Sequence, residues 1–359
     1  MRLHHLIAIL VFGSVFYSSG AFAVGVEFDG YYRLRYNSFY NLDLDHDQKP
    51  NLRSYTDMRF RLDPLFMITD QVRIYSSWNL LDGVLGGDPL RARTSANPSK
   101  SKDSLGLSSD ASEVGRQIKA ANRSSLFYGG AYAADAAVES TDLSPIQLRR
   151  AWAEVETDFG IAKFGRMPFH LGLGIYANSG DDFDQDIGTT RDRVTFETAY
   201  GPYYLMPGIG WSYEGLLDRS QDDSYEYFFL IGRRVEGNHV SLYLSYLAQD
   251  SGLLTEQNGD LVNKSTSYWI IDLYTEQMFR QLKFELEVAL FVGRFLGYDL
   301  MAVNSASRVS WKNEKYALLG EIGFSSGTTE KDFDSNKLKT FMFNRDYNVS
   351  QILFEEILP

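Results

Sequence analysis

The chain has 359 residues, of which 44% are hydrophobic and 14% aromatic, and it carries a formal net charge of −12 with no cysteine. The acidic balance excludes a bulk nucleic-acid binder, and the lack of cysteine excludes a disulfide framework. Downstream of residue 23 no stretch is apolar over the roughly 20 residues that a membrane-spanning helix needs, so a membrane protein with this sequence would cross with strands.

Residues 1–23 have the pattern of a secretory signal peptide. Arg2 gives a short basic region, residues 6–16 form an apolar stretch, and Ala-Phe-Ala at residues 21–23 is an A-x-A cleavage site. The apolar stretch is too short for an anchor helix. We expect export, cleavage near Ala23, and a single β-barrel domain over residues 24–359.

Residues 26–36 are the first segment of strict alternation. One parity carries Glu27, Asp29, Tyr31, Arg33 and Arg35, and the other carries Val26, Phe28, Tyr32, Leu34 and Tyr36. Successive side chains of a strand point to opposite faces, so this strand has one charged and one aromatic-aliphatic face. A strand of a soluble β-sandwich has the same pattern, so the interpretation depends on how often the pattern recurs.

Further segments of similar length repeat the alternation. They cover residues 55–63, 71–80, 146–157, 161–166, 191–200, 203–213, 225–234, 239–247, 265–274, 282–292, 300–311 and 316–324. Their length is close to that of a strand crossing a bilayer at a tilt. We expect Pro64 to end the second strand, because proline breaks a strand ladder. Residues 348–359 are as compatible with a short helix as with a strand.

The predicted reversals alternate between short and long. Short ones follow Asp63, Asp158, Gly201, Gly237, Gln277 and Asn313, and long ones follow Asn37, Leu81, Arg166, Gly215, Gln249 and Leu296. Short turns on one side and long outside loops on the other, above all 82–144 and 167–189, are typical of outer-membrane barrels. The sequence therefore predicts an all-β, transmembrane, antiparallel up-and-down β-barrel of about 14 or more strands.

The segments above give an odd number of strands, whereas bacterial single-chain barrels normally have an even number. Either the count is wrong by one, or residues 338–343 or the last dozen residues close the barrel, or C-terminal strands are missing. We favour missing C-terminal strands. Aromatic residues near strand ends favour girdles at a membrane interface, and the alternative is that they form the core of a soluble β-protein.

Residues 148–166 carry a recognisable pair of motifs. Leu-Arg-Arg-Ala-Trp-Ala-Glu-Val from residue 148 is followed by Gly-Ile-Ala-Lys-Phe-Gly-Arg at residues 160–166, and this resembles bacterial porin and alginate-export-like barrels. Residues 178–193, with the terminal Phe-Asn-Arg-Asp-Tyr from residue 343 and Ile-Leu-Phe-Glu-Glu-Ile-Leu from residue 352, resemble uncharacterised outer-membrane barrels of predatory and social deltaproteobacteria. The resemblance implies diffusion or export across the outer membrane without a cofactor.

The polar parity predicts the lumen wall. We expect pore-lining side chains at Arg33, Arg35, Arg59, Arg61, Arg73, Arg191 and Arg193 on the basic side, and at Glu285, Glu287 and Glu321 on the acidic side. Neighbouring strands lie about 4.8 Å apart, so the arginines of the first three strands would form one basic wall. Opposed walls would favour small polar solutes, especially anions. Alternatively, pairs with Asp29 and Asp57 merely neutralise a filled interior.

Two acidic loops have the oxygen spacing of calcium ligands. Asp182, Asp184 and Asp186 form the better candidate, although the loop lacks the glycine and glutamate of an EF-hand and could instead fold inward as a constriction. Apart from calcium we expect no cofactor. Catalysis has little support, because the only hint of a hydrolase is His239 beside Ser241 and Ser245 on one face.

The sequence thus leaves three hypotheses. The first is a channel for passive diffusion or export of small hydrophilic solutes, located in the bacterial outer membrane in contact with its lipid and forming a homo-oligomer. The second is a filled barrel whose outside loops, above all residues 82–144, bind a surface partner or a polysaccharide. The third is a barrel hydrolase, which we do not favour: we expect the protein not to be an enzyme.

Overall fold

The computed structural model describes residues 25–40, 52–84, 146–183, 185, 188–213, 224–249, 254–257, 260–263, 265–341, 343–344 and 347. Nearly all of this part of the chain lies in one antiparallel sheet, in which each long strand pairs with the next along the chain. Among the described residues no helix has the length and apolar character needed to cross a membrane. The expected all-β, up-and-down antiparallel architecture is confirmed.

Every segment that the alternation predicts is a strand. The long strands are β1 (Gly25–Tyr40), β2 (Leu52–Met67), β3 (Val72–Val84), β4 (Gln147–Thr157), β5 (Gly160–Pro168), β6 (Thr190–Tyr200), β7 (Tyr203–Tyr213), β8 (Ser224–Val235), β9 (Asn238–Gln249), β12 (Thr266–Phe279), β13 (Leu282–Phe295), β14 (Tyr298–Lys312) and β15 (Ala317–Ser325). A small hairpin, β10 (Leu254–Gln257) and β11 (Asp260–Asn263), lies between β9 and β12. After β15 come the short helix α6 (Glu330–Asp334) and β16 (Lys337–Leu338).

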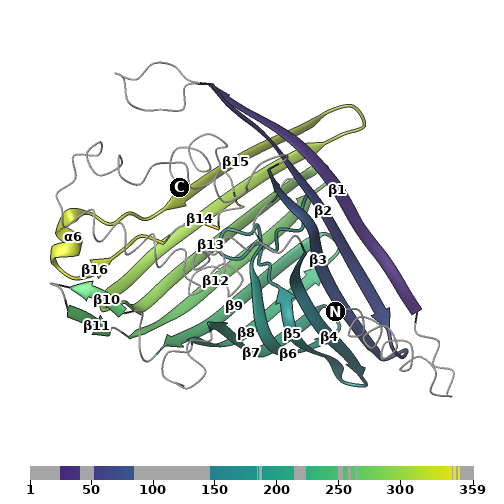
Figure 1. Ribbon diagram of the computed structural model, residues 1–359, viewed down its shortest axis with the longest axis horizontal. Helices are drawn as coiled ribbons and strands as arrows, with labels where there is room; N and C mark the ends of the chain where they lie inside the picture. The colour runs from purple at the N-terminus through teal and green to yellow at the C-terminus, as the bar shows by residue number, and fades with distance from the viewer. Residues whose placement is uncertain are drawn as a thin grey trace, which may run out of the picture.

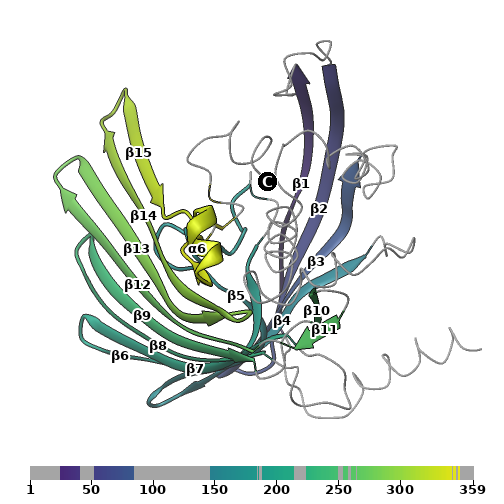
Figure 2. The same ribbon diagram turned by 90° about the vertical axis from the view of Figure 1, so that its left-hand side faces the viewer.

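The sheet curls like the wall of a barrel, with β1 and β15 at its two edges (Figures 1 and 2). Within the described residues β1 pairs with β2 and β15 pairs with β14, and no pairing joins β1 to β15. Residues 338–343 do not supply the closing strand, because β16 pairs in parallel with β14 at Asp299 and Leu300. The last dozen residues, 348–359, lie outside the described part of the chain.

Two predicted strand ends are wrong. β2 continues through Pro64 to Met67, because Asp63 and Pro64 have partners on β1 but none on β3, so the missing proline N–H costs no ladder bond there. The connection after β13 is a tight turn rather than a long loop. Leu296 and Gly297 both have positive φ, 49° and 85°, as a two-residue hairpin turn requires.

The two faces of the sheet differ as the alternation predicts. On β1 the outer side chains Phe28, Tyr32 and Tyr36 are 58–68% exposed, whereas Arg33 is 3% exposed on the concave face. The same apolar outer face continues across the sheet, with exposed side chains such as Phe164, Val194, Ile209, Phe229, Trp269, Leu273, Val292 and Val309. Aromatic residues near strand ends, such as Tyr200, are exposed on this face, which contradicts their alternative as the core of a soluble protein.

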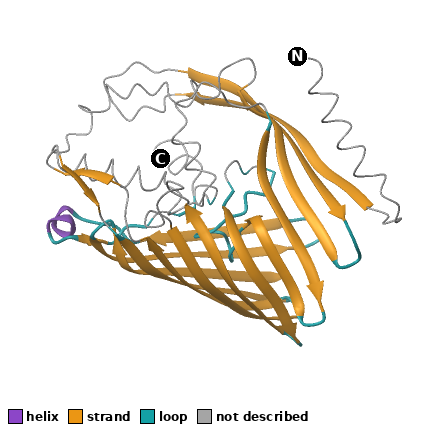
Figure 3. Ribbon diagram, turned by 60° about the horizontal axis from the view of Figure 1, so that its bottom comes forward, coloured by secondary structure: helices purple, strands orange, loops and turns teal. Residues whose placement is uncertain are grey.

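The buried core lies on the concave face. The chain between β5 and β6 folds into the hollow of the sheet, together with residues near the C-terminal end of the described chain (Figure 3). The described part of the predicted loop 167–189 therefore follows the inward alternative that the sequence left open. Residues 169–177 are rich in large apolar side chains, which are stabilised by burial against the sheet rather than by exposure to water.

Candidate functional site

The centre of the hollow is occupied by the described residues of the segment 169–189, namely 169–183, 185, 188 and 189, and we call this segment the inward loop. Backbone hydrogen bonds pinch it at its base, from Phe169 N to Thr189 O (3.0 Å) and from Thr189 N to Asn178 O (2.6 Å). The pinch divides the loop into an apolar lobe, residues 169–177, and a polar lobe, residues 178–188. The two lobes contact opposite sides of the hollow.

The apolar lobe packs on the strands β8–β14, and we call this contact the apolar seat. Phe169, Ile175 and Tyr176 are buried there beside Tyr243 and Phe291, with ring centroids of Tyr176 and Phe291 5.7 Å apart. The C-terminal segment completes the seat, because Phe341 stacks on Phe291 at 3.5 Å. This half of the hollow is filled by side chains.

A buried carboxylate also holds the apolar lobe. Glu287 on β13 accepts hydrogen bonds from the backbone N–H groups of Leu173, Gly174 (2.9 Å) and Ile175 (3.5 Å). Gly172 precedes this turn with φ +50°, and a Cβ there would come within 2.6 Å of the Glu287 carboxylate. The loop backbone can therefore approach β13 this closely only with glycine at residue 172.

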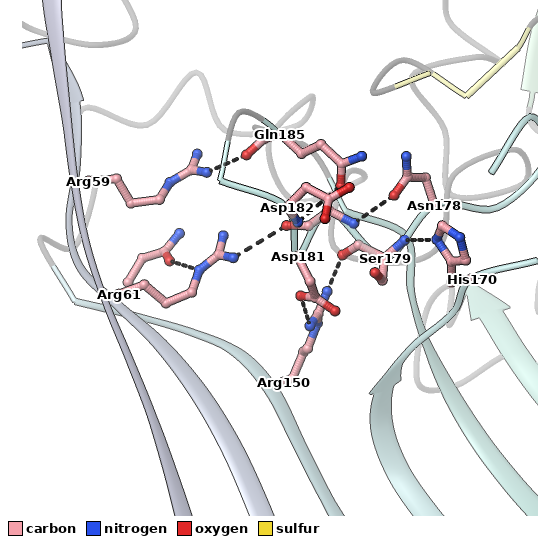
Figure 4. Close-up of polar contacts among 11 residues, drawn as sticks. Arg59, Arg61, Arg150, His170, Asn178, Ser179, Asp181, Asp182 and Gln185 are labelled. Carbon is pink, nitrogen blue, oxygen red and sulfur yellow. Dashed lines mark hydrogen bonds and ion pairs between the residues drawn. The ribbon is translucent and has the colours of Figure 1, made fainter. Parts of the chain in front are cut away.

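The polar lobe lies against the strands β1–β4, and we call this contact the polar seat. Arginine side chains of β2 and β4 point at backbone carbonyls of the lobe (Figure 4), and Arg33 of β1 does the same. The bonds run from Arg33 Nη1 to Phe183 O (2.7 Å), from Arg59 Nη1 to Gln185 O (2.8 Å), from Arg61 Nη1 to Gly180 O (3.3 Å), and from Arg150 Nη2 to Ser179 O. Arg150 also forms an ion pair with Asp181 (2.5 Å).

Most of the described bonds of the polar seat join a charged guanidinium group to a neutral acceptor. A backbone carbonyl satisfies a guanidinium N–H group but carries no formal charge, so most of these bonds do not neutralise the arginine. Among the described residues, Asp181 pairs with Arg150, and Asp57 pairs with Arg35 (3.0 Å) and Arg33 (3.8 Å). Arg33, Arg59 and Arg61 thus lie on the concave face and hold the loop, and their role as a channel lining stays a prediction.

Arg191 and Arg193 of β6 lie in a buried cluster and not on an exposed wall. Both are at most 3% exposed and form ion pairs with Glu226, which also accepts hydrogen bonds from Tyr243 (2.5 Å) and Ser245 (2.7 Å). Tyr176 accepts a hydrogen bond from Arg191, and burial raises the pKa of Tyr176 to about 12, so its phenol stays neutral. This cluster supports the apolar lobe.

A second group of charged side chains lies on the concave face near the short turns, and we call it the paired-charge belt. Its ion pairs are Arg73–Glu156 (3.5 Å), Lys163–Glu197 (2.7 Å), Lys163–Glu154 (3.6 Å), Lys283–Glu276 (3.0 Å), Lys283–Glu285 (3.0 Å) and Arg308–Glu321 (2.8 Å). Most of these side chains are partly exposed, unlike those around the inward loop, whereas Glu285 is buried at 7% exposure. Signs alternate along the belt, so it offers polar contacts to either charge.

The structure thus divides the predicted lining residues. Arg35, Arg73 and Glu321 lie in partly exposed ion pairs and buried Glu285 pairs with partly exposed Lys283, whereas Arg33, Arg59, Arg61, Arg191, Arg193 and Glu287 support the inward loop. Sequence reasoning missed Arg149, Arg150 and Lys163 as inward charges. Alternation could have indicated Arg150, because it shares a parity with Glu154 and Glu156 of β4, whereas the parity of Lys163 on β5 carries no other polar residue.

The calcium and hydrolase hypotheses gain no support. Asp184 and Asp186 lie outside the described residues, and Asp182 is exposed. Within the described chain no group of three or more His, Cys, Asp or Glu is placed to hold a metal ion. His239 Nε2 hydrogen-bonds Tyr204 at 2.6 Å, and Ser245 donates to Glu226. The histidine and Ser245 are therefore engaged elsewhere, and calcium binding stays a prediction.

The chain matches no protein-family model and no curated protein sequence. Solved structures of outer-membrane proteins match its shape. An anion-selective porin from Comamonas acidovorans is 12% identical over 84% of this chain and 79% of its own, with a TM-score of 0.47. OmpT of Vibrio cholerae is 10% identical over 85% and 77%, with a TM-score of 0.45.

The outer-membrane channel DcaP of Acinetobacter baumannii is 12% identical over 86% of this chain and 81% of its own, with a TM-score of 0.43. All these TM-scores lie below 0.5 and the identities are very low. The architecture of the chain therefore rests on its own strand register and on the contrast between the two faces of its sheet.

Proposed function

We propose that the chain forms a channel in the bacterial outer membrane that passes small hydrophilic solutes and favours anions. The observation that carries the proposal is the contrast between the faces of the sheet. The outer face exposes apolar and aromatic side chains across the strands, while the concave face carries arginines, lysines and glutamates. A soluble protein would bury the first face and expose the second.

A membrane explains this inverted arrangement. Hydrocarbon stabilises exposed apolar side chains, and strands cross it only when their backbone groups pair with neighbouring strands. The long strands here pair along their length with both neighbours, β1 and β15 at the edges excepted. Signal-peptide cleavage near Ala23 and assembly with other copies of the chain belong to this proposal.

The inward loop would narrow the channel. It contacts both sides of the hollow, so solutes would pass beside the polar lobe and then along the paired-charge belt. The polar seat gathers guanidinium groups of β1, β2 and β4 beside this passage, and a concentration of arginine side chains favours anions over cations in a narrow, partly dehydrated passage. Such passive diffusion needs no cofactor, and calcium binding to the polar lobe is a separate prediction.

Planar-bilayer recording of the refolded protein tests the proposal. We expect ion conductance and, in a potassium chloride gradient, a reversal potential that indicates preference for chloride. Replacing both Arg59 and Arg61 with Gln should lower this preference. Arg166→Gln is the matched control, because Arg166 shares the parity of exposed Phe164 and pairs with Asp192 on the outer face. No conductance from correctly folded protein would refute the channel.

A second candidate is a filled barrel whose outside loops bind a surface partner or polysaccharide. The filled apolar seat favours it, because one half of the hollow leaves no room for solute. Residues 85–144 of the principal loop lie outside the described chain. If the second candidate is correct, deleting this loop should abolish attachment to the surface partner or polysaccharide and leave solute uptake intact. If the protein acts only as a channel, the deletion should change neither attachment nor solute uptake.

A further inference from the structure

Arg149 is an inward arginine with no role so far in the predicted channel lining or in the two seats of the inward loop. The pairing of β3 with β4 shifts register between Ser77 and Trp78, so Arg150 lies opposite Ser77 and Leu148 opposite Trp78. Arg149 is the extra residue of this bulge. A bulge re-aims a side chain, and here it brings a second guanidinium to the concave face next to Arg150.

The side chain of Arg149 reaches the base of the inward loop. A Cβ built on Gly188 would collide with the carbonyl oxygen of Ser179 and lie 2.9 Å from Nη2 of Arg149. The two ends of the polar lobe, at Ser179 and Gly188, therefore meet directly over this guanidinium. The space is closed by backbone on the loop side and by β4 on the other side.

Three guanidinium groups at this place each keep an unused donor. Among the described residues, buried Nη1 of Arg149, Nη2 of Arg61 and Nε of Arg150 have no hydrogen-bond partner. The other donors of Arg61 bind Asn79 Oδ1 and Gly180 O, both at 3.3 Å, and those of Arg150 bind Ser179 and Asp181. Buried polar atoms without partners are rare and call for an explanation.

Among the described residues, guanidinium groups outnumber the carboxylates that act on them at this place. Arg149 interacts electrostatically with Arg150, Arg61 and Arg59, while Asp181 acts on Arg149 and Asp63 acts on Arg61. Asp181 is already paired with Arg150 and is half exposed. Guanidinium groups stay protonated in proteins, so the cluster cannot relieve its repulsion by losing a proton. Buried charge of this kind is stabilised by a counter-ion.

We propose that Arg61, Arg149 and Arg150, the arginine triad, bind one small oxyanion of the phosphate or sulfate class at the base of the inward loop. A tetrahedral oxyanion offers acceptors in several directions and satisfies the three unused donors together, whereas chloride offers one centre and a carboxylate two oxygens. The bound ion links β2 and β4 to the polar lobe. This binding goes beyond the proposed channel and does not require conduction.

Phosphate-dependent stability of the refolded protein in detergent tests the triad. The melting temperature is measured in rising concentrations of sodium phosphate, sodium sulfate, sodium acetate and sodium chloride at matched ionic strength. We expect phosphate and sulfate, but not acetate or chloride, to raise the melting temperature with the logarithm of their concentration, as linkage requires. Titration calorimetry with inorganic phosphate gives the affinity directly.

Two variants with opposite expected effects on the affinity for phosphate, and one control variant, complete the test. Arg149→Gln should weaken phosphate binding by at least about tenfold, since it removes one charge-assisted interaction of about 1.5–3 kcal/mol. Asp181→Asn should strengthen binding, because it removes the competing carboxylate at an exposed position. Arg166→Gln, which removes the same charge from the outer face, should leave binding unchanged.

The outcomes separate this inference from the proposed channel. Equal effects of phosphate and chloride on the unaltered protein would overturn the oxyanion site, and so would unaltered affinity in Arg149→Gln. If Arg149→Gln does not fold, the unaltered protein and Asp181→Asn decide the question alone. Phosphate binding without conductance would refute only the channel, and conductance without phosphate binding would refute only the arginine triad.

Discussion

The two seats of the inward loop hold it by opposite means. The polar seat joins arginines of β1, β2 and β4 to backbone carbonyls, whereas the apolar seat packs Phe169, Ile175 and Tyr176 against aromatic side chains of β9 and β13. The first contact is formed by charged side chains that are buried beneath the polar lobe. The second contact excludes water and solute, and it fixes where the loop can lie.

From this comparison we expect the two seats to have different roles, one in stability and the other in ion selectivity. Apolar burial and the buried Glu226 cluster should supply most of the stability that positions the loop, because burial is additive and insensitive to salt. The polar seat should contribute less stability and more selectivity, because its bonds are exchanged against water and its charge acts over distance. The following variants test these two roles, from the largest expected effect to the smallest.

Glu226→Ala should have the largest effect on stability. It would leave Arg191 and Arg193 as buried cations without their carboxylate, at a cost of about 3–5 kcal/mol in the free energy of unfolding. Urea-induced unfolding in detergent, followed by tryptophan fluorescence, measures the loss. A loss no greater than that of a polar-seat variant would contradict the assignment of stability to the apolar seat.

Arg61→Gln should have an intermediate effect on stability and a clear effect on selectivity. The variant loses charge-assisted bonds to Gly180 O and Asn79, at a cost of about 1.5–3 kcal/mol. Chloride preference in bilayer recordings should fall in the same variant. Glu226→Ala protein that still folds should keep the chloride preference. Loss of chloride preference in this variant would contradict the separate roles of the two seats.

Gly172→Ala should disturb the apolar lobe alone. Alanine is strained at φ +50°, by about 1–2 kcal/mol, and its Cβ would press on the Glu287 carboxylate. The expected results are a lower melting temperature and unchanged ion selectivity. Gly201→Ala is the control, since Gly201 has a similar φ of +56° with nothing within 4 Å of a Cβ, so it reports backbone strain without the contact.

Glu156→Gln should have the smallest effect. Its ion pair with Arg73 joins side chains that are 53% and 37% exposed, and water and salt screen such pairs to about 0–1 kcal/mol. The unfolding free energy should change by less than that of any variant above. A larger loss would show that the paired-charge belt stabilises the sheet as well as bordering a solute path.

Much of the fold could be predicted from the residues because a two-residue period is a local property. Alternation located every long strand, and it placed Phe28 outside and Arg33 inside. Strand ends were less certain where tertiary pairing mattered. Pro64 is tolerated within β2 because β3 does not pair with it. Leu296 adopts a positive φ in a tight turn, a conformation that a leucine in the sequence does not predict. The direction of the inward loop was left open by its composition.

The candidate site was predicted only in part. Arginines on one parity of β1 and β2 lie on the concave face, as alternation indicated, but they bind carbonyl groups about 120–150 residues away along the chain, which no spacing reveals. The ion pairs of Arg191 and Arg193 with Glu226 were missed for the same reason. Arg149 was missed because a bulge overrides the alternation that would have pointed it outward.

The sequence by itself therefore determined the strands and which of their two faces is apolar and which is charged. These properties follow from the two-residue alternation of side chains, which is local in the sequence. Only the tertiary structure decided that residues 169–189 turn inward, which arginines they cover, and which half of the hollow is filled. Those outcomes depend on which distant surfaces bury apolar area and satisfy backbone carbonyls best, and that competition is settled only when the whole sheet has curled.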